Sequence, residues 1–82
     1  MKYDLRFKPR SVKDLKRLTA ETRTRIIEEV EEMTEDLTGD VKHLTNFTPE
    51  YRLRVGNYRV LFEIQGNTIV EYGVRHRREA YR

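Results

Sequence analysis

Residues 51–64 alternate apolar and polar side chains on either side of a Gly56-Asn57 dipeptide, the most regular pattern in the sequence. A period of two is typical of strands that bury one face, and Gly-Asn between two such runs predicts a hairpin with a two-residue turn. That loop length pairs Val55 with Tyr58, which places the apolar side chains of both strands on one face. This face carries Tyr51, Leu53, Val55, Tyr58, Val60, Phe62 and Ile64. The opposite face carries Arg52, Arg54 and Arg59.

A third strand is expected next, in which Val70, Tyr72 and Val74 alternate with Ile69, Glu71 and Gly73. The length of the loop before this strand decides which of the two alternating sets of residues faces the core. A two-residue turn at Gly66-Asn67 would put Glu71 on the core face, so this parity of the strand favours a loop of three or five residues. The resulting pairs are Phe62 with Val70, Val60 with Tyr72, and Tyr58 with Val74. Glu71 then stays in water, Gly73 faces Arg59, and Arg75 joins the three arginines of the hairpin on one sheet face.

The first half of the chain predicts a strand and two helices. Tyr3, Leu5 and Phe7 alternate with charged residues up to Pro9, as in a short half-buried strand. Ser11 is expected to cap a short helix and Thr19 a longer one that Gly39 ends. The apolar stripes of the two helices are Val12, Leu15 and Leu18, and Ile26, Val30, Met33 and Leu37. The expected fold is α+β, a single domain over 1–82, with an N-terminal strand and a two-helix hairpin packed on a mostly antiparallel four-stranded sheet.

Size and composition exclude several classes of site and suggest a cellular location and a kind of partner. A chain of 82 residues without cysteine has no disulfide framework, thiolate metal site or cysteine nucleophile. The charged N-terminal segment and the longest apolar run, Val60 to Phe62, argue against a signal peptide or a membrane span, and a cytoplasmic location is expected. The net charge of +3 divides into blocks of +6 over 1–27, −7 over 28–50 and +4 over 51–82. A polyanionic partner is one explanation of the basic blocks, and simple solubility is the other.

The arginine face and the tail after it favour RNA chemistry. RNA cleavage needs activation of a 2′-hydroxyl, cations around the phosphorane and a proton for the leaving oxygen. Arg59 and Arg75 could hold the phosphate, His76 can exchange protons near neutral pH, and Tyr81 could stack on a base. Each residue also has a plainer interpretation, with His76 an exposed strand-end residue and Tyr81 a cover for the sheet edge. His43 is interpreted as an ordinary loop residue.

Two segments, Tyr51-Arg-Leu-Arg-Val-Gly-Asn-Tyr-Arg-Val60 and Val74-Arg-His-Arg-Arg-Glu-Ala-Tyr81, resemble the RelE/ParE toxin superfamily. The tail from His76 to Tyr81 is similar to the RelE branch. The resemblance implies a metal-independent and cofactor-free endoribonuclease that cleaves mRNA in the 30S ribosomal A site through 2′-hydroxyl attack and so inhibits translation. It also implies a cognate antitoxin, through which the toxin-antitoxin complex binds operator DNA.

The resemblance also assigns roles to individual residues. Arg59 and Arg75 match phosphate-stabilising arginines, and Tyr81 matches a base-stacking tyrosine. Arg52 and Arg54 stand where RelE members have lysines, and since arginine does not exchange protons, His76 becomes the candidate general base. Further RNA contacts are expected from Lys42, Arg77 and Arg78. Asp40 and Glu50 are weaker candidates for a carboxylate near the site.

Two other functions fit the same fold. One is a ParE-like inhibitor of DNA gyrase, which acts by binding alone, and the other is a catalytically silent RNA-binding module. The antitoxin surface could be the basic N-terminal block, although a solvated helix face explains that block equally well. The block consists of Lys13, Lys16, Arg17, Arg23 and Arg25. The acidic face of the second helix is interpreted as solvated, and it would repel RNA from that side.

Overall fold

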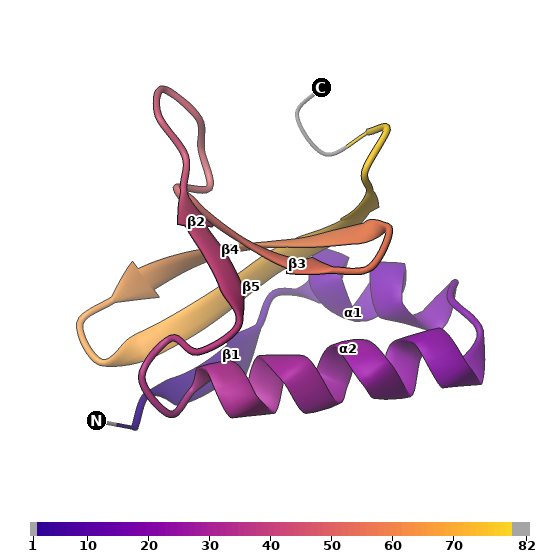
Figure 1. The fold of residues 1–82 in the computed structure, drawn as a ribbon, viewed down its shortest axis with the longest axis horizontal. Coiled ribbons are helices and arrows are strands. Elements are labelled where there is room, and N and C mark those ends of the chain that lie inside the picture. The colour runs from indigo at the N-terminus through magenta and orange to yellow at the C-terminus, as the bar shows by residue number, and fades with distance from the viewer. Residues whose placement is uncertain (1, 80–82) are drawn as a thin grey trace.

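The computed structural model describes residues 2–79, which form one five-stranded sheet with two helices on one face (Figure 1). The elements in chain order are β1 (Asp4–Phe7), α1 (Pro9–Lys16), α2 (Ala20–Met33), β2 (Asp40–His43), β3 (Tyr51–Val55), β4 (Tyr58–Gln65) and β5 (Thr68–His76). The order in the sheet is β1-β5-β4-β3-β2, with β1 parallel to β5 and every other pair antiparallel. The α+β class is therefore confirmed. The expected count of four strands was wrong, because β2 is a four-residue edge strand whose single apolar residue, Val41, gives no alternation to detect.

The two helices pack on the sheet through the stripes that the sequence indicates, except that Val12 of α1 was wrongly placed in its stripe and is exposed. Leu15 of α1 and Ile26, Val30 and Met33 of α2 are buried against the sheet. The sheet contributes Leu53, Val55, Val60, Phe62, Ile69 and Val74 to the same core. The face away from the helices is bordered by the loop between β2 and β3 and by the chain after β5, which both rise on that side (Figure 1).

The ends of the helices differ from the prediction at two of three positions. Thr19 caps α2 as expected, because its hydroxyl accepts a hydrogen bond from the N–H of Thr22 at 3.2 Å. Ser11 does not cap α1, which begins at Pro9, and the serine is buried within the first turn. Proline suits the first helical position because its fixed φ is helical and that position needs no N–H bond. α2 ends at Met33 rather than near Gly39, since Leu37 has a φ of +58°, outside the right-handed helical region.

The β4–β5 hairpin has a different register from the one that parity favours. A two-residue turn at Gly66-Asn67 does join the strands, pairing Gln65 with Thr68 and Phe62 with Glu71. The register then shifts, so that Leu61 pairs with Gly73 and Tyr72 is an extra residue in β5. This bulge reverses the parity of β5 partway along the strand. The expected pairs Phe62–Val70, Val60–Tyr72 and Tyr58–Val74 were therefore wrong.

Glu71 is buried by this register and does not remain in water as expected. Its side chain shares the core face with Phe62, and the residue is 0% exposed. Neither carboxyl oxygen has a hydrogen-bond partner among the described residues. Burial raises the pKa of Glu71 to about 8, so the group is protonated at neutral pH.

The burial of Glu71 predicts that the protein loses stability as the pH rises. The unfolded chain ionises this carboxyl above pH 4.5, whereas the folded protein keeps it protonated up to about pH 8. Between these values the free energy of unfolding should fall by up to about 1.4 kcal/mol per pH unit. Glu71→Gln should remove this contribution, and urea unfolding of both proteins at pH 5 and pH 8 measures the difference.

Glu35→Gln, at an exposed carboxylate, serves as the control and should keep the pH dependence of the wild type. Equal pH dependence in Glu71→Gln and the wild type would show that Glu71 is already ionised in the folded protein.

Candidate nucleic-acid interface

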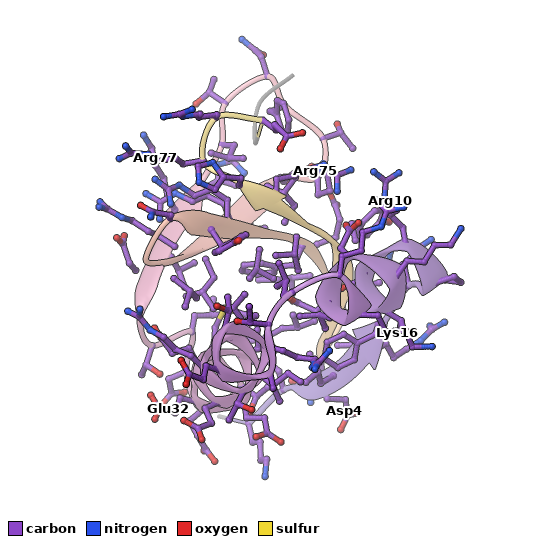
Figure 2. All side chains as sticks on the ribbon, turned by 90° about the vertical axis from the view of Figure 1, so that its right-hand side faces the viewer. Asp4, Arg10, Lys16, Glu32, Arg75 and Arg77 are labelled. Carbon is purple, nitrogen blue, oxygen red and sulfur yellow. The ribbon has the colours of Figure 1, made fainter. Side chains whose placement is uncertain are left out.

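A row of arginines crosses three strands on the face away from the helices. Arg54 pairs with Arg59, and Arg59 pairs with Arg75. The sequence predicted that these arginines share a face, but it placed Gly73 rather than Arg75 opposite Arg59, and that detail was wrong because of the bulge. Arg54 is exposed, whereas the Nη1 of Arg59 donates to the carbonyls of Gly56 and Tyr58, each at 3.1 Å. Figure 2 shows Arg75 and Arg77 at the opposite end of the molecule from Glu32 of α2.

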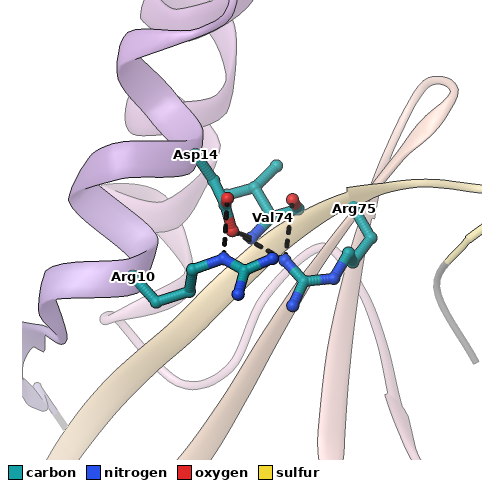
Figure 3. Close-up of polar contacts among 4 residues, drawn as sticks. All are labelled: Arg10, Asp14, Val74 and Arg75. Carbon is teal, nitrogen blue, oxygen red and sulfur yellow. Dashed lines mark hydrogen bonds and ion pairs between the residues drawn. The ribbon is translucent and has the colours of Figure 1, made fainter. Parts of the chain in front are cut away.

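Arg75 is held by Asp14, a residue of α1 that sequence reasoning missed (Figure 3). The Oδ2 atom of Asp14 accepts from Nη1 of Arg75 at 2.7 Å and from the backbone N–H of Val74 at 3.0 Å. Its Oδ1 atom accepts from Nε of Arg10 at 3.1 Å. Asp14 is 7% exposed, so little water reaches its carboxylate. The three donors stabilise its negative charge in place of water. One buried carboxylate thus fixes the Arg75 guanidinium and caps the free edge of β5.

Gly73 allows this arrangement because it has no side chain. A Cβ atom at this position would lie 3.0 Å from Nη1 of Arg75 and 3.1 Å from Oδ2 of Asp14. Any larger residue would push the carboxylate and the guanidinium away from the strand. The only sequence signal for the cluster is the spacing of Arg10 and Asp14 in α1, one helical turn apart, which is common on helix surfaces.

His76 lies next to Arg75 but on the other side of the strand. It pairs with Tyr58, and the two rings meet edge to face with centroids 5.6 Å apart. Its Nδ1 atom accepts weakly from the N–H of Arg78 at 3.3 Å, which leaves the proton of the neutral ring on Nε2. His76 and Arg75 nevertheless line a common pocket of about 260 Å³ beside Asp14.

The remaining predicted residues are less closely grouped. Nη1 of Arg52 donates to the carbonyl of Asp40 at 2.6 Å and to its Oδ1 at 3.0 Å. The Arg52 guanidinium lowers the pKa of Asp40, which makes that carboxylate a weaker base. Lys42 pairs with Arg52 and is exposed. Glu50 has its carboxylate 3.5 Å from Nε2 of His43, which ends β2 rather than lying in a loop.

The tail continues from the arginine row. Arg77 and Arg78 are exposed, and the backbone N–H of Arg77 donates to the carbonyl of Asn57 at 2.7 Å, which ties the tail to the β3–β4 turn. Tyr81 lies outside the described residues. Within residues 2–79, no group of three or more His, Cys, Asp and Glu residues could hold a metal ion. No helix in that range is long and apolar enough to cross a membrane.

The described residues form a small α+β domain with a basic sheet face. Residues 5–81 match the family model described as ParE toxin of type II toxin-antitoxin system, parDE. The chain is 41% identical over 75 residues to Toxin RelE3 of Methanocaldococcus jannaschii, with 85% of each chain covered. This chain belongs to the RelE/ParE family of type II toxin-antitoxin toxins.

Solved structures agree with this assignment. The RelB-RelE antitoxin-toxin complex from Methanococcus jannaschii matches with 36% identity and a TM-score of 0.75, covering 89% of this chain and 91% of that one. The archaeal RelE-RelB complex from Pyrococcus horikoshii matches in fold with a TM-score of 0.79 at 24% identity, covering 98% of this chain and 100% of that one.

The Asp14 cluster predicts a graded loss of stability. Asp14→Ala removes the acceptor of the Val74 N–H and the partner of Arg75, and it should lower the free energy of unfolding by about 1–3 kcal/mol. Asp14→Asn keeps an oxygen that can accept from Val74, so its loss should be smaller. Urea unfolding measures both variants. The control is Asp4→Ala at an exposed position of β1, and an Asp14→Ala variant as stable as this control would contradict the bridging role.

Proposed function

We propose that this chain is a ribosome-dependent mRNA endonuclease that cleaves in the 30S A site and inhibits translation. The cross-strand row of Arg54, Arg59 and Arg75, with Arg75 fixed by Asp14, is the observation that carries the proposal. Fixed cations are suited to a reaction in which negative charge builds up on a phosphate. The RelE names of the relatives in the comparisons add support. A small chain can rely on the ribosome to position the mRNA.

In the proposed reaction, the 2′-hydroxyl of one nucleotide attacks the adjacent phosphate and the 5′-oxygen of the next nucleotide leaves. The products are a 2′,3′-cyclic phosphate and a 5′-hydroxyl, and no metal ion or cofactor takes part. Arg59 and Arg75 stabilise the phosphorane, and His76 accepts the proton of the 2′-hydroxyl after its weak bond to the Arg78 N–H opens. The leaving 5′-oxygen takes a proton from solvent, and His76 later returns its proton to solvent. Tyr81 is assigned to stacking on a base.

Other basic residues would hold the RNA on either side of the cleaved bond. Arg52, Arg54 and Lys42 extend the row across β3 and β2, and Arg77 and Arg78 extend it into the tail. The acidic face of α2 lies at the opposite end of the molecule from Arg77, as Glu32 marks in Figure 2. RNA would therefore approach in one orientation.

A cognate antitoxin is the second partner in this proposal, and it would carry the complex to operator DNA. Several of the similar structures are toxin-antitoxin complexes, which favours such a partner. The basic residues of α1 and its surroundings, among them Lys13 and Lys16, are exposed and would attract an acidic peptide. The proposed cellular location is the cytoplasm, where ribosomes are found.

The arginine row predicts specific losses of cleavage. Arg59→Ala and Arg75→Ala should each lower the single-turnover cleavage rate by about 10²–10³ because each removes a phosphorane-stabilising group. Primer extension on mRNA in programmed ribosomes measures the rate, and circular dichroism verifies folding. Lys2→Ala, at an exposed cation before β1 and away from the row, is the control and should cleave at the wild-type rate. A folded wild type that leaves ribosome-bound mRNA uncut would refute the endonuclease.

The assignment of His76 predicts a change in the pH profile. A general base works in its deprotonated form, so the wild-type rate should rise with pH until the base is deprotonated and then level off. His76→Ala should lose that rise and cleave about 10²–10⁴ times more slowly, whereas His43→Ala should keep the profile. Single-turnover rates from pH 5.5 to 8.5 provide the measurement. A profile unchanged in His76→Ala would remove this residue from the mechanism.

Inhibition of DNA gyrase is the second candidate function, because the matching family model is described as ParE toxin. In that case, the chain acts by binding alone, and inhibition of supercoiling should survive Arg75→Ala and Tyr81→Ala. Wild-type protein that inhibits supercoiling and cuts no mRNA would favour this candidate. RNA binding with neither effect would favour the silent RNA-binding module.

A further inference from the structure

A second pocket, of about 410 Å³, shares Arg10 and Arg75 with the His76 pocket. Leu61 and Gly73, which face each other across β4 and β5, contribute to its lining. Tyr72, the extra residue of the bulge, lines it as well. The pocket belongs to the arginine-bearing face of the sheet, because Leu61 and Gly73 have the same strand parity as Arg59 and Arg75.

The bulge gives this pocket a flat apolar lining. Without the bulge, the Gly66-Asn67 turn would pair Tyr72 with Leu61 and direct Gly73 toward the core, whereas in the structure Gly73 pairs with Leu61 and the half-buried Tyr72 lines the pocket beside it. Leu61 is only 5% exposed and adds apolar lining, and Gly73 is buried beneath the Arg75 guanidinium and the Asp14 carboxylate, which it brings close to the strand. An aromatic ring next to a guanidinium is suited to a planar, anionic ligand.

Cations surround this lining. Nζ of Lys8 lies 4.8 Å from the centre of the Tyr72 ring, and Arg10 and Arg75 also line the pocket. The nearby carboxylate, Asp14, is buried and already bonded to both arginines. A ligand of this pocket therefore needs negative charge next to a flat, largely apolar group, and a nucleotide has both.

A peptide strand fits this part of β5 less well. Strand addition needs free backbone groups on the edge, but the N–H of Val74 is bonded to Asp14 and the carbonyl of Glu71 accepts from the N–H of Lys8. The edge beside Tyr72 is therefore closed to main-chain pairing at both of these positions.

We propose that this pocket binds one nucleotide of the RNA next to the phosphate held by Arg75, a proposal that rests on the endonuclease function above. The base lies against Tyr72 and Leu61, and Lys8 moves from the ring of Tyr72 to the phosphate of that nucleotide. Arg10 adds a second positive charge. Tyr72 and Lys8 thus extend the site beyond the residues that the family resemblance assigns.

The test measures binding of a fluorescent, uncleavable 2′-O-methyl RNA by anisotropy. Tyr72→Leu preserves apolar volume but not the ring, and it should weaken binding by about 5- to 100-fold, whereas Tyr72→Phe should bind like the wild type. An RNA with an abasic site at one particular position should bind the wild type and Tyr72→Leu equally. Lys8→Gln should reduce the slope of log K against log salt by about 0.7, and the control Lys2→Gln, at an exposed lysine outside this pocket, should not.

The outcomes separate this proposal from the proposed function. The nucleotide pocket is overturned if Tyr72→Leu binds the RNA as tightly as the wild type does. It is also overturned if Tyr72→Leu binds every abasic RNA more weakly than the wild type does. Both results count even if the wild type cleaves mRNA on ribosomes. A polyglutamate peptide that displaces the RNA and is itself weakened as much by Tyr72→Leu would assign the pocket to a protein partner and also overturn it. A loss confined to one base position supports the pocket, even in a wild type that cleaves no mRNA and so fails as an endonuclease.

Discussion

The extra residue at Tyr72 determines what each face of the sheet carries. Before the bulge, Ile69 and Glu71 of β5 face the helices, and after it Val74 does. With the same turn and an unbroken alternation, Gly73 and Arg75 would face the helices and Val74 would pair with Arg59 on the opposite face. The apolar core under β5 and the arginine row above it therefore depend on one inserted residue. The burial of the Glu71 carboxyl group comes from the Gly66-Asn67 turn, which pairs Glu71 with Phe62 before the bulge.

Asp14 connects this sheet to the helical layer through charge rather than apolar packing. Its carboxylate accepts hydrogen bonds from the N–H of Val74 and from the guanidinium groups of Arg75 and Arg10. It therefore gives a partner to a backbone N–H at the edge of β5 and also orients Arg75. An apolar side chain at this position could do neither. The geometry of the basic face thus depends on the docking of α1 as much as on the strands that carry the arginines.

Features set by neighbours in sequence could be predicted. The Gly56-Asn57 turn fixes the register of β3 and β4, so the pairing of Arg54 with Arg59 followed from turn length alone. The cap that Thr19 forms on α2 could also be predicted, because it involves only Thr19 and Thr22. The toxin family was predicted from two short motifs, and the comparisons confirmed it.

Features that depend on contacts between residues far apart in the sequence could not be predicted. Odd-numbered and even-numbered residues of β5 both include apolar side chains, so the sequence does not show at which residue the core-facing set changes. For this reason Glu71 was wrongly expected to face water. Asp14 was missed because its partner Val74 is 60 residues away, and a charged residue near a helix surface usually contacts solvent. Pro9, rather than Ser11, begins α1, although both residues are compatible with a helix start.

The sheet order has a consequence for biosynthesis. β1 comes first in the chain, yet it pairs only with β5, the last strand, and Asp14 reaches Arg75 across 61 residues. A nascent chain that has not yet released β5 from the ribosome can form neither contact. The basic face is therefore assembled only after β5 has been released, so a partly synthesised chain does not present it.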